Sequence, residues 1–262
     1  MHNLFGTKHL ILIAISVILI VGLYFLSRKL RLKTISKILF GVGIVSEAVK
    51  IFYYIIQNEQ KYGGVLPKTD LPFHLCSIQI IFIAIIVISQ SEKLKRFILS
   101  FMLPSCLFGG IAAILLATTS SLNGTWVITA QFFLYHVAIT VFALYLLTSK
   151  EFKLELKDFV NCLKFLVIIM FFSIYINSIL YDGINNINFM YVVSPPVKGL
   201  PYLNEDKGWL VYILRYLLLV IACITICYIK PIVCSIKTFI KNKKQKTQEN
   251  ESLVVENENK TE

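Results

Sequence analysis

The sequence contains few charged residues. Asp, Glu, Lys and Arg together make up 16% of its 262 residues, whereas a soluble domain carries about 25%. Long polar stretches are confined to one loop and the C-terminal tail, and 56% of the residues are hydrophobic. This composition excludes a soluble globular domain and indicates a polytopic protein of the cell membrane.

Paired cysteines are also missing. None of the six cysteines forms a C-x-x-C pair, and all six lie in or beside apolar runs. This spacing indicates neither a zinc site nor a disulfide framework, and we expect no metal and no cofactor. A buried cysteine usually behaves as a small hydrophobic residue, which is the default interpretation of each of them.

The sequence has no internal repeat, and few glycine or proline breaks interrupt its apolar runs. Pro104 and the pair Gly109 and Gly110 are the candidates for such a break. Transporters are commonly built from two pseudo-symmetric halves whose broken helices bind a solute near the bilayer midplane. These absences weigh against a small-solute transporter, which stays an alternative.

The apolar runs predict an all-α polytopic membrane helical bundle with about seven transmembrane helices. The first run is followed, not preceded, by basic residues and lacks a small-residue cleavage site, so we interpret it as a retained span. Residues 1–235 form the predicted membrane domain, and residues 236–262 form a predicted disordered tail that is basic and then acidic. The predicted helices span about residues 9–26, 36–56, 71–89, 97–117, 126–148, 159–181 and 208–229.

Basic residues give the chain a net charge of +11 and gather after the first, third and fifth predicted helices and in the tail. The positive-inside rule makes that side cytoplasmic, with the N-terminus outside and the C-terminus inside. Trp126 and Trp209 fall at the outer ends of their helices, where interfacial aromatic residues are enriched. The clustering therefore indicates topology and contact with anionic lipid at the cytoplasmic face, not binding of nucleic acid.

Several ionisable or reactive side chains fall inside the predicted spans, where lipid makes them costly and each is a candidate for function. At a rise of about 1.5 Å per residue, His136 lies about 15 Å below the outer interface, Arg215 about 9 Å and Cys76 about 8 Å. Such depths predict a pocket open toward the outer leaflet. The candidates are Glu47 and Lys50 in the second helix, His74 and Cys76 in the third, His136 in the fifth and Arg215 in the seventh.

Each of these side chains also has an interpretation without function. Glu47 and Lys50 are spaced i, i+3 and can neutralise one another. Arg215 can reach the lipid headgroups or pair with Glu47. A single buried histidine such as His136 is more often a satisfied hydrogen-bonding group than a catalyst, and Cys76 by itself is more often inert.

Helical geometry limits how the third helix could use its cysteine. His74 and Cys76 point about 200° apart, so they do not face one pocket, whereas Cys76 shares its face with Gln79. If Cys76 is a nucleophile, its base comes from another helix, and His136 is the candidate. A histidine can take the proton of the thiol and return it to a hydroxyl, which suits acyl transfer between lipid esters. The long outer loop would then supply donors to the oxyanion.

Three stretches resemble a known family. They are "LPFHLCSIQI" in the third helix, "QFFLYHVAI" in the fifth, and "NINFMYVVSPP" followed by "NEDKGWLVYI" around the last outer loop. In this order they are similar to motifs of the transmembrane protein 164 family, which includes the bacterial YwaF-like membrane proteins. Glu47 also stands at the family's glutamate position. The chain departs from the family pattern at three positions. Val137 replaces a small residue, Phe189 replaces a tyrosine and Leu210 replaces a proline.

The resemblance implies a seven-helix membrane fold and a cysteine-dependent phospholipid acyltransferase. Cys76 would be the nucleophile and His136 the general base, with membrane phospholipids and lysophospholipids as partners and no obligate protein partner. The alternative is a non-catalytic lipid-binding or scaffold protein, in which the polar groups only fix helix packing. The residues assigned by the resemblance or by position to substrate binding or to the pocket are His74, Gln79, Glu47, Asn188, Tyr191, Asp206 and Arg215.

Overall fold

The structure is a computed structural model that describes residues 4–57, 65–184, 187–196, 200, 202–204 and 206–258. Its long helices are α1 (Thr7–Ser27), α2 (Leu32–Phe52), α5 (Glu92–Leu115), α7 (Trp126–Thr148), α8 (Leu156–Leu180), α9 (Trp209–Cys227) and α10 (Ile229–Glu258). The shorter ones are α4 (Leu75–Ile88), α6 (Thr119–Asn123), the π-helix η1 (Tyr53–Gln57) and the 3₁₀ turns η2 (Lys68–Asp70) and η3 (Phe189–Tyr191). No strand occurs within these ranges, which confirms the all-α prediction.

Six helices within the described ranges are long and apolar enough to cross a membrane, namely α1, α2 with η1, α5, α7, α8 and α9. The third predicted span is shorter than expected, because α4 has 14 residues and begins at Leu75 instead of residue 71. At about 1.5 Å per residue such a helix is about 21 Å long, against about 30 Å of hydrocarbon. Pro72 keeps Leu71 out of the helix, since proline disfavours a helical residue before it. Leu71 is accordingly extended, with ψ 151°.

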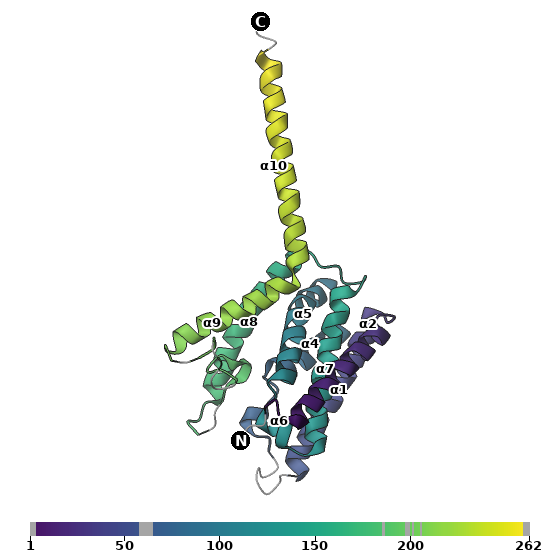
Figure 1. Ribbon diagram of the computed structural model, residues 1–262, viewed down its shortest axis with the longest axis vertical. Coiled ribbons are helices and arrows are strands. Elements are labelled where there is room, and N and C mark those ends of the chain that lie inside the picture. The colour runs from purple at the N-terminus through teal and green to yellow at the C-terminus, as the bar shows by residue number, and fades with distance from the viewer. Residues whose placement is uncertain are drawn as a thin grey trace.

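Successive helices nevertheless alternate in direction. At one end, which we name the basic end, Tyr145 donates to the carbonyl of Leu30 at 3.0 Å and Tyr228 donates to that of Ser100 at 2.7 Å. At the other end, named the loop end, His9 Nε2 donates to the carbonyl of Ile114 at 2.9 Å. The chain termini therefore lie at opposite ends of the bundle (Figure 1). That the basic end faces the cytoplasm stays a prediction from its lysine and arginine residues.

Helices α5 and α7 form the centre of the bundle. In the most apolar part of each of these two helices 61% of the residues are buried, compared with 11–22% in the other four spans. Gly110 of α5 allows the closest approach, because a Cβ there would collide with the Thr140 hydroxyl and lie 3.1 Å from the carbonyl oxygen of His136. The candidate base therefore sits on the face of α7 that meets α5.

An ion pair joins α5 and α8 at the basic end. Arg96 binds both carboxylate oxygens of Asp158, each at 2.7 Å, and donates to the carbonyl of Lys153 at 2.9 Å. Asp158 is fully buried and also accepts from the backbone N–H of Glu155 at 2.9 Å. A planar guanidinium suits this two-point contact, and the extra bonds offset the cost of burying the charge.

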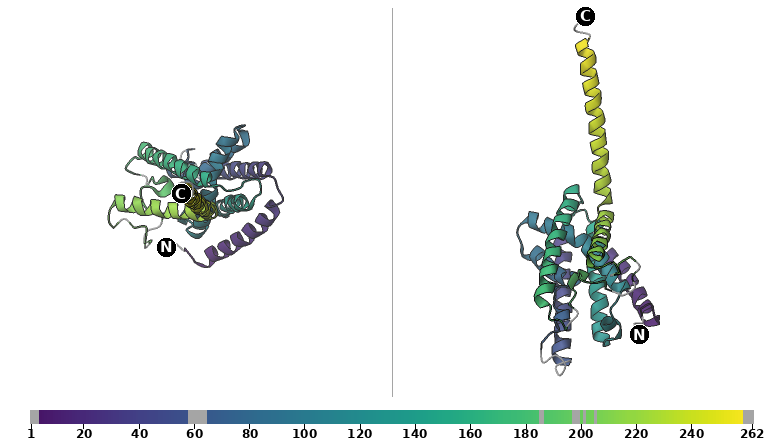
Figure 2. Two further views of the ribbon diagram at one scale, coloured as in Figure 1. Left: turned by 90° about the horizontal axis from the view of Figure 1, so that it is seen from above. Right: turned by 90° about the vertical axis from the view of Figure 1, so that its left-hand side faces the viewer.

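The C-terminal tail is helical instead of irregular along the described residues. Helix α10 continues directly from the end of α9 and projects away from the bundle (Figures 1 and 2). Its lysine, glutamine and glutamate residues favour a helix, which the composition argument for disorder left out of account. The division between a domain of residues 1–235 and a tail of residues 236–262 stays a prediction, and residues 259–262 lie outside the described ranges.

We expect Gly110→Ala to destabilise the protein by about 1–3 kcal/mol, the usual cost of forcing a methyl group into a packed core. The measurement is thermal unfolding of the purified protein in detergent. Gly41→Ala is the matched control, since nothing lies within 4 Å of its Cβ position, and a helix interior prefers alanine. Equal stability of the two variants would contradict the close α5–α7 contact.

Candidate functional site

The predicted site begins where α4 begins. His74 is the N-cap of α4, with an extended backbone (φ −68°, ψ 153°), and its carbonyl accepts the first helical hydrogen bond from Ile78 at 3.0 Å. Its ring packs edge-on against Phe189, with 4.9 Å between ring centroids, and lies 5.8 Å from the ring of Tyr191. The start of α4 therefore meets the 187–196 loop, which precedes α9.

The 187–196 loop is buried in the bundle and contains strained backbone. Phe189 and Met190 are 1% and 4% exposed. Met190 and Tyr191 have φ of 56° and 53°, a left-handed conformation that is unfavourable for side chains other than glycine. Strain of this kind persists only where the surroundings fix it, and it concentrates at functional sites.

Side chains of α8 and α9 hold this strained backbone in place. Asn177 accepts from the N–H of Phe189 at 2.7 Å and donates to its carbonyl at 3.1 Å. Tyr212 donates to the carbonyl of Tyr191, and Tyr216 donates to that of Met190 at 2.9 Å. These donors were not among the predicted site residues, although the i, i+4 spacing of two tyrosines in an apolar helix is a visible signal.

Asn188 shapes the same loop from within. Its side chain accepts from the N–H groups of Val193 at 3.1 Å and Ser194 at 3.3 Å, and donates to the Ser194 carbonyl at 2.8 Å. Trp209 donates to the carbonyl of Val192 at 2.9 Å. The amide of Asn188 is therefore engaged in loop structure, which leaves little capacity for contact with a headgroup.

Cys76 occupies the first turn of α4 and is half-buried. Its carbonyl accepts a hydrogen bond from Tyr135 of α7 at 2.8 Å. Its thiol lies near Tyr191 of the loop and Cys106 of α5, and the backbone N–H groups of Cys76 and Ser77 face it. The thiol therefore lies among α4, α5, α7 and the 187–196 loop, beside free donors at a helix N-terminus.

Gln79, one turn further along α4, is 1% exposed. Its amide donates to Ser105 of α5 at 3.0 Å and to the carbonyl of Leu75 at 3.0 Å. Its oxygen accepts from the thiol of Cys106 at 3.4 Å. The side chain thus links α4 to α5, and its polar groups are used inside the bundle.

His136 is buried on α7, but its ring does not bond Cys76. Its Nδ1 lies 2.6 Å from the carbonyl of Phe132. A carbonyl accepts, so we assign the proton to Nδ1, which leaves Nε2 as a basic nitrogen. That nitrogen is buried, and no described residue forms a hydrogen bond with it. Among the described residues it is therefore Tyr135, not His136, that bonds the backbone carbonyl of Cys76. The side chains of two consecutive helical residues point about 100° apart, so both do not face the same group.

Glu47 and Lys50 neutralise one another, as one of the two interpretations of their spacing predicted. Their ion pair is 2.8 Å long, and Lys50 also donates to the carbonyl of Asp70 at 2.8 Å. These contacts tie α2 to η2, just before the His74 turn. Burial raises the pKa of the Asp70 carboxyl, although Lys50 opposes the shift.

The contacts of Arg215 lie in the loop before α9. Arg215 donates to the side chain of Asn204 at 2.8 Å and lies over the ring of Tyr202, 6.0 Å from its centroid. It pairs with the loop before α9 and not with Glu47. Asp206 is exposed in the turn before α9. The structure thus brings together His74, Cys76 and Tyr191, with the Glu47–Lys50 pair nearby.

The fold defines the class of protein. It is an all-α, multi-pass integral membrane protein in which polar residues gather where α4 begins. Among the side chains that the structure describes, no three His, Cys, Asp or Glu residues form a group that could hold a metal ion.

The chain belongs to the TMEM164 family, whose sequence model matches residues 4–228. This range contains every helix from α1 to α9, and it confirms the resemblance drawn from the three sequence stretches. No curated protein and no solved structure matches the chain.

We expect Tyr216→Phe to loosen the 187–196 loop, because the carbonyl of Met190 loses its donor. The cost is about 0.5–1.5 kcal/mol for one net hydrogen bond. The measurement is hydrogen exchange of the loop amides in detergent, which should become faster. Tyr175→Phe on the exposed face of α8 is the control, and unchanged exchange in Tyr216→Phe would show that the tyrosine does not hold the loop.

Proposed function

We propose that this protein is an integral membrane acyltransferase that moves a fatty acyl chain between phospholipids through a thioester on Cys76. The observation that carries the proposal is that the Nε2 of His136 has no hydrogen-bond partner among the described residues. The residue before it on α7, Tyr135, bonds the backbone of Cys76. A buried polar atom without a partner costs free energy, so a functional role is the natural explanation.

The chemistry proceeds in two balanced steps. The Cys76 thiol gives its proton to His136 and attacks the ester carbonyl of a donor phospholipid. The ester bond breaks, the thioester forms, and the released lysophospholipid oxygen takes the proton from His136. A lysophospholipid hydroxyl then gives its proton to His136 and attacks the thioester, which forms the new ester and restores the thiol.

The start of α4 supports this role for Cys76. A thiolate in apolar surroundings needs donors or a positive end of a dipole beside it, and a helix N-terminus supplies both. The N–H groups of Cys76 and Ser77 face the thiol, and such donors also suit an oxyanion. They take the place that the sequence analysis gave to the long outer loop.

The proton transfer needs a rearrangement on binding. His136 Nδ1 is held by Phe132, so Nε2 reaches the thiol through a bridging water or a turn of the side chain when lipid enters. Catalytic hydrogen bonds are often long in the free enzyme and tighten in the complex. His74 is the competing base. It is the extended N-cap of α4, so the separation of about 200° expected for two helical residues does not apply to it, and its ring contacts Tyr191.

A non-catalytic lipid-binding or scaffold protein is the second candidate. It is favoured by Gln79, whose polar groups all bond inside the bundle, as expected where polar residues only fix packing. A small-solute transporter has less support, because Glu47, His136 and Arg215 belong to three separate groups of contacts.

A thioester trap tests the proposal. Detergent-solubilised protein is incubated with a phospholipid whose acyl chain carries an alkyne, and the readout is a covalent tag that neutral hydroxylamine removes. We expect a tag on the wild type and on Cys234→Ala, a control at an exposed cysteine, and none on Cys76→Ala. His136→Gln should slow tagging by about 10²-fold or more, the usual contribution of a general base.

The variants also separate the competing interpretations. Slow tagging of His74→Gln with normal tagging of His136→Gln would move the base to His74. A folded wild type that acquires no tag from several donor phospholipids would overturn the acyltransferase and favour the non-catalytic protein.

A further inference from the structure

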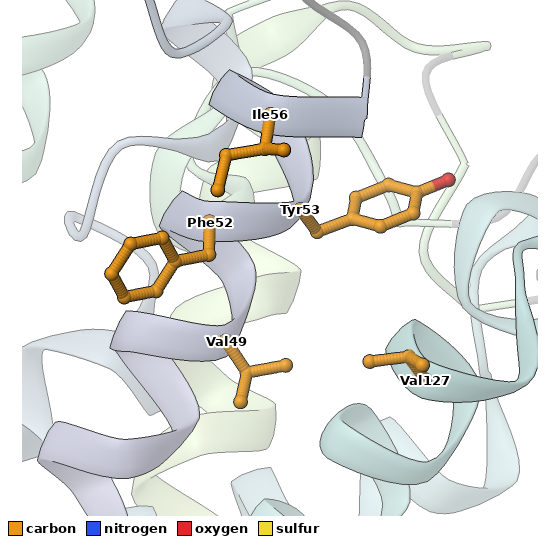
Figure 3. A pocket seen from close by; sticks show the side chains of 5 residues that line it. All are labelled: Val49, Phe52, Tyr53, Ile56 and Val127. Carbon is orange, nitrogen blue, oxygen red and sulfur yellow. The ribbon is translucent and has the colours of Figure 1, made fainter.

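A groove opens between the end of α2 and the start of α7 at the loop end of the bundle. Its volume is about 660 Å³, and it is lined by Val49, Phe52, Tyr53, Ile56 and Val127. Figure 3 shows Val49 and Val127 on opposite sides of the gap, with the ring of Tyr53 above them. Apart from the Tyr53 hydroxyl, these side chains present hydrocarbon.

Local backbone structure and one hydrogen bond bound the groove. Residues 53–57 form the π-helix η1, and such wide turns are frequent at functional sites. Deeper along the same seam, the side chain of Gln131 donates to the hydroxyl of Ser46 at 2.6 Å and joins α7 to α2. The seam is therefore closed at Ser46 and open above it.

The groove is continuous with the surface that contacts lipid. Phe52 and Ile56 are 62% and 67% exposed on a helix that is long and apolar enough to cross a membrane, so we expect these side chains to face hydrocarbon. A water molecule in the groove would need two to four polar partners, and the apolar lining does not offer them. The occupant that this lining fits is a hydrocarbon chain from the bilayer.

One stripe of α7 connects the groove with Cys76. Val127, Gln131 and Tyr135 are spaced i, i+4 and i+8, so they lie on the same face of the helix. The first lines the groove, the second bonds Ser46 and the third bonds the carbonyl of Cys76. The distance along the axis from Val127 to Tyr135 is about 12 Å.

We infer that this groove binds one acyl chain of a membrane phospholipid, and that the Ser46–Gln131 hydrogen bond separates the bound chain from Cys76. The binding itself is independent of the proposed reaction. Whether the bound chain belongs to the acyl donor or to the acyl acceptor is a question that arises only under the proposed function.

Photolabelling tests the inference in the full-length Cys76→Ala protein, which cannot form the thioester. The protein is held in detergent with a low molar ratio of phosphatidylcholine that carries a diazirine in its acyl chain, so detergent dilutes non-specific contacts. Irradiation is followed by mass spectrometry of the labelled peptides. We expect labels at residues 49–56 and 127 that exceed those on the exposed face of α1 by about fivefold or more.

Filling the groove provides the matched comparison. Val127→Trp should lower labelling at residues 49–56 by about fivefold, whereas Val17→Trp on the exposed face of α1 should leave it unchanged. Labels spread over all lipid-facing helices in proportion to their exposure would overturn the inference, whether or not the tryptophan variants fold. Labels in the groove without a thioester in wild type would support acyl-chain binding in the groove and contradict the proposed acyltransferase. A thioester without labels in the groove would support the acyltransferase and contradict binding in the groove.

Discussion

Hydrocarbon cannot satisfy polar groups, so nearly every polar side chain inside this bundle finds its partner on another part of the protein. Gln79 bonds Ser105 and Cys106, Tyr135 bonds the backbone of Cys76, and Gln131 bonds Ser46. Each of these contacts also joins two helices. The same constraint that removes polar groups from lipid therefore fixes how the helices pack. The Nε2 of His136 is one of four buried side-chain atoms that have no hydrogen-bond partner among the described residues.

The strained loop depends on this arrangement as well. Met190 and Tyr191 keep a left-handed backbone because Asn177, Tyr212 and Tyr216 bond the peptide groups around them. The loop in turn covers the start of α4, where Cys76 and His74 lie. The short α4 and the 187–196 loop thus meet at the loop end, where α4 also packs on α5.

Much of the fold could be predicted from the sequence, since the length of each hydrophobic run indicates directly whether it can span a membrane. The exceptions have local causes. Pro72 delays α4, and the helix-favouring composition of the tail gives α10. The candidate site was harder to predict, because periodicity gives the face of a residue but not the distance between two helices. Among the described contacts between α4 and α7, it is Tyr135 and not His136 that bonds Cys76, at the backbone carbonyl.

The sequence by itself determined the class of protein, the membrane-crossing runs and the motifs shared with the TMEM164 family. These features depend on composition and on the spacing of residues close together in the sequence, which do not require the folded structure. Only the tertiary structure decided that Lys50 also bonds the carbonyl of Asp70, that Arg215 pairs with Asn204, and that Gln79 links two helices. Those choices depend on which side chains come within about 3 Å of one another, a distance set by helix packing and not by the order of residues along the chain.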